Sequence, residues 1–300
     1  MNRRNFLQSS AALAALAPLG LRAADKPARK NKKALMFGTL RVDREKPKSV
    51  LERFKLLREA DFHGVEVNSG LGQPEVLAAQ QASGLEMASV TIATHWTHPL
   101  SSPNPTAREV TVEALKQGLR DAKAYGAKSV LLVPAVVNKE MSYTDAYARS
   151  VAEIKKAVPL AEELGVAISI ENVWNAFLMS PLEAAAYVDS FNSPMVRWHF
   201  DVGNVVNTGW PQHWVEALGH RIANVHVKEF SRKLRDEKGP RAGFSVDLLE
   251  GDSDWPAVMA ALDKANYTGW LITEQYRIPG LDDAAWLAHL SAKLDKILAL

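Results

Sequence analysis

The sequence predicts an α/β fold of the (β/α)8 class, the TIM barrel, and three observations carry this prediction. Eight short apolar runs alternate with eight longer amphipathic segments along the chain. The 300 residues, 47% hydrophobic and 23% charged, have the composition of a globular protein and the length of one such barrel. Gly84, Gly126 and Gly165 each separate an amphipathic segment from the next apolar run, as glycine does where a helix ends.

The eight units are expected in strict order along the chain. The apolar runs predict strands at 34–40, 64–68, 86–93, 129–134, 166–172, 196–201, 222–229 and 269–274. The amphipathic segments predict helices near 48–60, 74–83, 106–125, 144–164, 181–191, 212–219, 254–265 and 282–299. The alternative is a doubly wound open sheet, which usually has a glycine-rich first turn that residues 38–41 lack. The long connection 229–252 is expected to be a functional lid.

The N-terminus is expected to be an export signal rather than part of the barrel. In residues 1–24 the pair Arg3-Arg4 precedes a run of small apolar residues, which is too short for a permanent membrane anchor. The order resembles a twin-arginine signal, cleaved near Ala23 or Ala24, and the alternative is an amphipathic N-terminal helix. This predicts a periplasmic protein that meets the twin-arginine export machinery. Residues 25–33 are expected to be a solvated linker, and residues 34–300 a single barrel domain.

Charge and composition exclude several classes of function. The formal net charge is +2, and the chain without residues 1–24 loses three arginines and no acid, which leaves −1. A slightly acidic protein lacks the basic surface that nucleic acid requires, so no nucleic-acid partner is expected. The sequence has no cysteine, so disulfides, thiolate zinc sites and cysteine nucleophiles are excluded.

Acidic and histidine residues stand at the ends of four consecutive predicted strands. These are Glu171, Asp201, His226 and Glu274. Barrel enzymes carry their active sites at this end, and the period-2 alternation of each strand turns the side chains inward. Three converging carboxylates repel each other unless a cation lies among them. Three oxygens and one imidazole predict one divalent cation, most of all Mn²⁺, with Mg²⁺, Co²⁺, Fe²⁺ or Zn²⁺ as alternatives; separate ion pairs are the alternative to a metal.

Other polar and aromatic residues near strand ends are candidates for binding substrate. His95 follows the third strand and is either a hydroxyl-binding residue or an ordinary loop histidine. Trp174 follows the fifth strand, and its indole either covers a sugar ring or packs as a core or lid residue. Lys228 lies two residues after His226 and either stabilises an oxyanion or forms a salt bridge with Glu229 or Asp201.

Four segments of this sequence resemble the metal-site strands of the xylose isomerase-like TIM barrels, the sugar isomerase/epimerase group. They read SIENVWN, HFDVGN, NVHVKE and TEQ, and the resemblance covers residues 34–298. It implies that Glu171, Asp201, His226 and Glu274 are the divalent-metal ligands. It also implies that Glu171 and Glu274 transfer protons on opposite faces of a sugar.

The resemblance also bears on the residues around the substrate. Arg232 stands six residues after the metal histidine, where the epimerases have a substrate-binding arginine. Asn204 stands where the epimerases have a histidine, and Phe177 where they have a further glutamate. These two departures concern the substrate and leave the metal ligands in place.

Together, the residues and the resemblance predict a metal-dependent sugar isomerase or epimerase. A divalent cation bound to a ketone oxygen and its neighbouring hydroxyl stabilises the enediolate that forms when a glutamate removes the α-proton. The alternative reaction is that of a lyase or hydratase acting on keto-sugars, keto-glycosides or cyclitols. An endonuclease and a non-catalytic sugar-binding protein fit the sequence less well. Because phosphorylated sugars are chiefly intracellular, we expect a non-phosphorylated carbohydrate substrate; the chain is compatible with a homo-oligomer.

Overall fold

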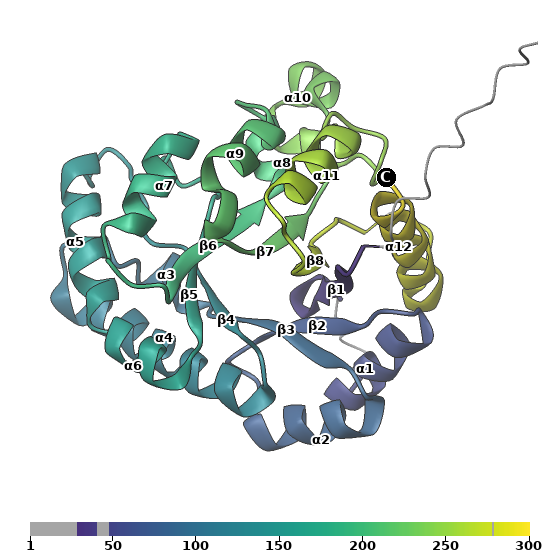
Figure 1. The fold of residues 1–300 in the computed structure, drawn as a ribbon, viewed down its shortest axis with the longest axis horizontal. Helices are drawn as coiled ribbons and strands as arrows, with labels where there is room; N and C mark the ends of the chain where they lie inside the picture. Colours follow the sequence, from purple (N-terminus) through teal and green to yellow (C-terminus); the bar gives the residue numbers. More distant parts are fainter. Residues whose placement is uncertain (1–28, 41–47, 278) are drawn as a thin grey trace, which may run out of the picture.

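Eight parallel strands close into one barrel in this computed structural model, which describes residues 29–40, 48–277 and 279–300 (Figure 1). Their order around the barrel is their order in the sequence, and β1 closes the ring by pairing with β8. The bounds are β1 Lys32–Met36, β2 Gly64–Asn68, β3 Glu86–Thr91, β4 Ser129–Leu132, β5 Ala167–Glu171, β6 Val196–Asp201, β7 Ile222–Val227 and β8 Trp270–Thr273. The predicted (β/α)8 fold is confirmed.

The longer helices surround the barrel and cover its outer face (Figure 1). They are α1 Val50–Glu59, α2 Gln73–Ser83, α4 Pro105–Tyr125, α5 Tyr143–Lys155, α6 Val158–Leu164, α7 Pro181–Asp189, α9 Pro211–Leu218, α11 Trp255–Lys264 and α12 Asp283–Leu298. The helix predicted at 144–164 is two helices, because Pro159 has no N–H to donate and its ring would clash with the carbonyl of Lys155 in a continuous helix. Gly84, Gly126 and Gly165 end their helices with φ of 69°, 81° and 64°, the left-handed conformation.

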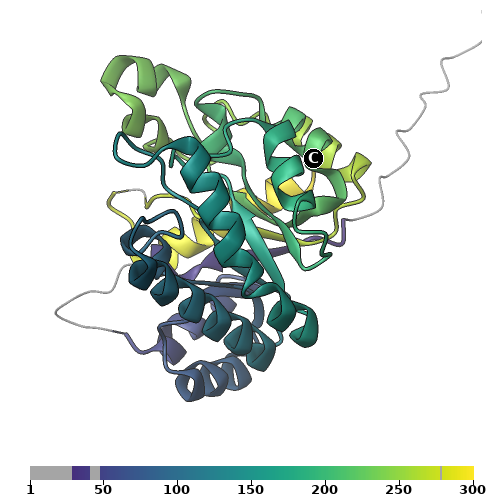
Figure 2. The same ribbon diagram turned by 90° about the vertical axis from the view of Figure 1, so that its left-hand side faces the viewer.

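Short helical segments are inserted between the main elements. They are the 3-10 turns η1 Phe37–Thr39, η2 Gly219–Arg221 and η3 Pro240–Phe244, and the helices α3 Thr94–Thr97, α8 Val202–Val206 and α10 Arg232–Lys238. The long connection after β7 contains α10 and η3, and its light-green α10 segment projects at one end of the barrel in Figure 2. The side chain of Ser231 starts α10 by accepting from the backbone N–H of Leu234.

The prediction that residues 25–33 form a solvated linker is wrong for residues 29–33, which pack against the barrel. β1 begins at Lys32, two residues earlier than expected. The Lys33 side chain is buried, and its ammonium lies 2.7 Å from Asp295 Oδ1 and 2.9 Å from Asp61 Oδ2. Arg29 pairs with Asp263 at 2.7 Å. Carboxylates near the ends of helices therefore bind the basic side chains of residues 29–33. The same basic side chains were the reason for predicting a solvated linker.

The predicted export signal, residues 1–24, lies outside the described residues. Among the residues that the structure describes, no helix combines the length and the apolarity that a membrane crossing requires.

The predicted strand alternation is confirmed, and it makes the interior of the barrel polar. Ile168 and Ile170 on β5, like Val225 and Val227 on β7, belong to the core between the strands and the helices. The alternate side chains point inward, and Asn224, for example, donates across the barrel to Ser129 Oγ at 2.6 Å. Contacts between inward side chains of different strands therefore decide how the polar groups inside the barrel are paired.

Candidate active site

The structure brings the four predicted metal ligands together at the C-terminal end of the barrel. One ligand atom from each of Glu171, Asp201, His226 and Glu274 lies within 4.8 Å of every other. His226 Nδ1 lies at the centre, 3.0 Å from Glu171 Oε1, 3.5 Å from Glu274 Oε2 and 3.8 Å from Asp201 Oδ2. Glu171, Asp201 and His226 are buried, and Glu274 is partly exposed. We call these residues the four-ligand cluster.

Backbone hydrogen bonds fix the direction of the Asp201 carboxylate. Asp201 is the N-cap of α8, so its Oδ1 accepts from the N–H of Asn204 at 2.7 Å. The Asn172 side chain holds the backbone of Asp201 by accepting from its N–H at 3.0 Å and donating to its carbonyl at 2.7 Å. Oδ2 takes no part in these bonds and faces the cluster. Sequence reasoning gave Asn172 no role, although it directly follows Glu171.

Lys228 places its ammonium between two carboxylates of the cluster. Its Nζ lies 3.0 Å from Asp201 Oδ2 and 2.5 Å from Glu274 Oε2. Of the expected salt bridges, the one with Asp201 forms. The carboxylate of Glu229 instead accepts from the backbone N–H groups of Leu249 and Ser253. Burial opposes the charge on Lys228, but the surrounding carboxylates outweigh it and raise its pKa, so Lys228 is a cation.

The two glutamates of the cluster differ in their affinity for a proton. Burial raises the pKa of Glu171 to about 7, although His226 works in the opposite direction. Burial acts the same way on Glu274, but Lys228 and His226 together outweigh it and hold the pKa of Glu274 below its usual range. The cluster therefore pairs a carboxyl that takes a proton near neutral pH with one that stays ionised.

The cluster fits a divalent cation by its donor set. Burial also raises the pKa of Asp201, so three carboxyl groups at this point resist being ionised together. A divalent cation removes that conflict, and Asp201 Oδ2, which faces the cluster beside Lys228 Nζ, is an oxygen donor for it. Three oxygens and one imidazole nitrogen match the preferences of Mn²⁺, Mg²⁺ and Fe²⁺.

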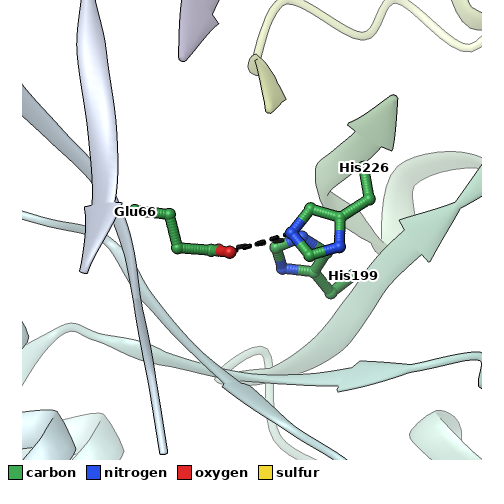
Figure 3. A group of neighbouring side chains, drawn as sticks. All are labelled: Glu66, His199 and His226. Atoms are coloured by element: carbon green, nitrogen blue, oxygen red, sulfur yellow. Dashed lines mark hydrogen bonds and ion pairs between the residues drawn. The ribbon is translucent and has the colours of Figure 1, made fainter. Parts of the chain in front are cut away.

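A second layer of side chains lies directly against the cluster; sequence reasoning placed His199 behind Asp201 but missed Glu66. Glu66 on β2 has its Oε1 2.8 Å from His226 Nε2 (Figure 3). His199 on β6 packs edge-on against His226, with ring centroids 4.1 Å apart. Burial lowers the pKa of His199 well below its ordinary value, so this imidazole is neutral. Alternation in GVEVN was the available signal, because Val65 and Val67 face the helices and Glu66 must then point inward.

A cavity of about 530 Å³ opens over the cluster. Its walls carry four aromatic side chains and several polar ones: Trp96, Trp174, Phe244, Tyr276, Asn68, His95, Asn204, Lys228 and Arg241. Four of the five predicted substrate-binding residues thus line it. This size and this mixture of aromatic and polar groups are typical of small-molecule sites.

Two of the lining residues are held by specific contacts. Burial lowers the pKa of His95 to about 4, so its ring is neutral at pH 7, and its Nδ1 lies 3.4 Å from the N–H of Val133. Trp174 donates from Nε1 to the carbonyl of Asn204 at 3.0 Å and packs against Phe244 with ring centroids 4.9 Å apart and the rings tilted by 44°. The indole is therefore part of a fixed wall, and 37% of the residue stays exposed.

Comparison with known proteins gives the family. Residues 54–296 match the xylose isomerase-like TIM barrel. The chain belongs to this family. It is 24% identical over 239 residues to a putative L-ribulose-5-phosphate 3-epimerase, SgbU, of Escherichia coli K12, covering 75% of this chain and 83% of the relative. It is 24% identical over 247 residues to the inosose dehydratase of Clostridium perfringens strain 13, covering 74% and 80%.

Solved structures share the fold of this xylose isomerase-like barrel. An L-ribulose 3-epimerase superposes with a TM-score of 0.73 at 19% identity, covering 89% of this chain and 94% of that one. The 3-keto-D-glucoside 4-epimerase YcjR of E. coli superposes with a TM-score of 0.70 at 15% identity, covering 89% and 98%.

Arg232, the fifth predicted substrate-binding residue of this xylose isomerase-like barrel, does not line the cavity. Its guanidinium donates to the carbonyls of Val206 at 3.1 Å and Gly209 at 2.8 Å. Arg241, farther along the same loop, lines the cavity instead. Arg232 starts α10, and the nearby carbonyls at the end of α8 capture its side chain, which residue spacing could not indicate.

Proposed function

We propose that this protein is a divalent-metal-dependent sugar isomerase or epimerase that uses Glu171 and Glu274 as its proton-transfer pair. The observation that carries the proposal is the placement of these two carboxyls around one cluster at the floor of an open cavity. They come from β5 and from the residue after β8, so two strands separate their points of attachment on the barrel wall. The 3-epimerases among the relatives and similar structures support the same class of reaction.

The two glutamates suit opposite halves of a proton transfer. A bound divalent cation, which we expect to be Mn²⁺, supplies positive charge beside the carbonyl and hydroxyl oxygens of the sugar. Glu274, which stays ionised, takes the proton from the carbon next to the carbonyl. Glu171, on the other side of the cluster, is placed to return a proton to the substrate.

The cavity walls offer contacts of the kind that carbohydrates use. Trp96 and Tyr276 expose 51% and 55% of their surface, which leaves ring faces free to pack on a sugar. Neutral His95 and Asn204 offer hydrogen bonds to hydroxyl groups. Arg241 supplies a charged donor at the same cavity.

A lyase or hydratase acting on keto-sugars, keto-glycosides or cyclitols is the second candidate. Lys228 favours it, because its ammonium lines the cavity beside Glu274 and offers a charged hydrogen-bond donor to a departing hydroxyl. The inosose dehydratases among the relatives support this reading.

The N-terminal sequence extends the proposal to location and substrate. The twin-arginine-like segment supports export to the periplasm, with the metal loaded into the folded protein before it leaves the cytoplasm. Loading first matters because zinc and copper outcompete manganese at most sites of this kind. An exported enzyme meets free rather than phosphorylated sugars, so we propose a non-phosphorylated keto-sugar or glycoside as substrate.

The test combines metal analysis with a panel of ketoses and keto-glycosides in D₂O, followed by proton NMR. We expect one bound divalent cation and solvent exchange at the carbon next to the carbonyl. A product that is an isomer of the substrate, apart from the exchanged deuterium, indicates an isomerase. A product that has lost water indicates the lyase. Glu274→Gln should abolish exchange while substrate still binds, because the amide of glutamine cannot accept the proton as a carboxylate does. Glu86→Gln, a change at the opposite end of the barrel, is the matched control. Protein that binds no metal and exchanges no proton contradicts both candidates.

A further inference from the structure

We propose that Glu66 is a positioning residue that holds the His226 ring with Nδ1 directed at the four-ligand cluster. The inference rests on the proposed metal-dependent function and concerns the layer of side chains beside it. In Figure 3, Glu66 reaches from β2 across the interior of the barrel to His226 on β7. The two strands lie on different sides of the closed sheet, so this contact spans the barrel.

The geometry assigns different tasks to the two nitrogens of His226. Nε2 lies 2.8 Å from Glu66 Oε1, and Nδ1 lies 3.0 Å from Glu171 Oε1. A carboxylate accepts hydrogen bonds and donates none, so Nε2 donates its proton to Glu66. Nδ1 faces the carboxylate of Glu171 in this structure, and a cation bound at the cluster would take the place of the proton on Nδ1. A carboxylate behind a metal-binding histidine fixes the tautomer and the ring orientation in this way.

Burial explains why this contact matters to the protein. Glu66 is 1% exposed, so without a partner its carboxylate would be strongly disfavoured. Its Oε1 bonds to His226, and its Oε2, which has no hydrogen-bond partner, lies 3.8 Å from His199 Nε2. The histidine and the glutamate therefore hold each other in place, and the bond fixes the direction of Nδ1.

His199 closes the other side of the ring. It packs edge-on against His226 at an interplanar angle of 70°, and both of its own nitrogens lack hydrogen-bond partners. A neutral imidazole at this distance blocks rotation of the His226 ring by contact alone. Glu66 and His199 together thus prevent the flip that would turn Nδ1 away from the cluster.

Ligand atoms of Glu66, His199 and His226 also lie within 4.8 Å of one another, so a second cation here is the competing reading. Such a cation would need the lone pair of His226 Nε2, which already carries the proton that Nε2 donates to Glu66. The positioning role of Glu66 requires no change in these contacts. The stoichiometry of metal binding separates the two readings.

The experiment measures Mn²⁺ binding to the full-length protein by electron paramagnetic resonance of the free ion. We expect one equivalent in the wild type. Glu66→Gln keeps the shape but loses the charge and should weaken binding about 10-fold, and Glu66→Leu, which loses the hydrogen bond, about 100-fold. Glu153→Gln, a buried glutamate on the outer helix α5, is the matched control and should bind Mn²⁺ as the wild type does.

A spectroscopic readout separates positioning from general damage. In protein loaded with diamagnetic Zn²⁺, ¹⁵N NMR of His226 should show a protonated Nε2 in the wild type and loss of this single tautomer in Glu66→Leu. Either Glu66 variant, if folded and with wild-type Mn²⁺ affinity, overturns the proposal. So does a wild type that binds two equivalents of which Glu66→Leu loses one, because Glu66 is then a ligand. Wild-type protein that binds no Mn²⁺ rejects the metal site itself, and this role with it.

Discussion

Replacing Lys228 by methionine should destabilise the metal-free protein and strengthen its binding of a divalent cation. The ammonium lies 3.0 Å from Asp201 Oδ2 and 2.5 Å from Glu274 Oε2, and the lysine is 6% exposed. Lys228→Met keeps most of the side-chain volume but leaves both carboxylates without their cation. Removing one partner of a buried ion pair costs about 3–5 kcal/mol. For a barrel of this size, 3 kcal/mol corresponds to a fall in Tm of about 6–12 °C.

A metal ion should restore much of this loss, because it supplies positive charge to the same carboxylates. By linkage, the stability recovered on binding appears as affinity, and 3 kcal/mol corresponds to about 100-fold tighter binding. The assay is differential scanning calorimetry with and without Mn²⁺, together with calorimetric titration of Mn²⁺. We expect Mn²⁺ to raise the Tm of Lys228→Met by more than it raises the Tm of the wild type.

Lys33→Met provides the matched control. Lys33 is also a buried lysine paired with two carboxylates, Asp61 and Asp295, but it lies at the start of β1, away from the cluster. This variant should lose stability by the same amount with and without Mn²⁺. An equal loss in both conditions for Lys228→Met as well would refute the reasoning that ammonium and metal serve the same carboxylates.

Three further predictions concern other parts of the chain. Burial lowers the pKa of His95 to about 4, below the ordinary value of 6.5. As the pH falls from 6.5 to 4, His95 therefore binds a proton in the unfolded chain but not yet in the folded protein, and the free energy of unfolding decreases. Between pH 7 and 4 the wild type should lose up to about 3 kcal/mol more of its unfolding free energy than His95→Gln does, measured by urea denaturation; parallel curves would contradict this. Arg241→Ala should raise KM more than Arg232→Ala, since only Arg241 lines the cavity; steady-state kinetics with equal effects would discard the distinction. Changing Arg3 and Arg4 to lysine should retain the protein in the cytoplasm, and cell fractionation that finds even the wild type there would reject export.

The sequence by itself determined the barrel and the inward direction of the side chains near the C-terminal ends of its later strands; the exact strand bounds differ, and β1, for example, ends at Met36 rather than at residue 40. Period-2 alternation is a local property, so SIE and NVHV were enough to turn Glu171 and His226 inward. Parallel strands of a closed barrel end at one rim, and this rule alone predicted that Asp201 and Glu274 would meet them.

Only the tertiary structure decided which polar side chains pair with each other. Glu66 and His226 are 160 residues apart, and their contact exists because the sheet closes through β8 and β1, which leaves β2 and β7 both turning these side chains into the same interior. Arg232 and Arg241 could not be ranked from spacing, because long side chains take whichever acceptors the folded loop places within reach. Strand alternation fixes the direction of a residue, but the partner that it meets depends on distances across the barrel that no local pattern contains.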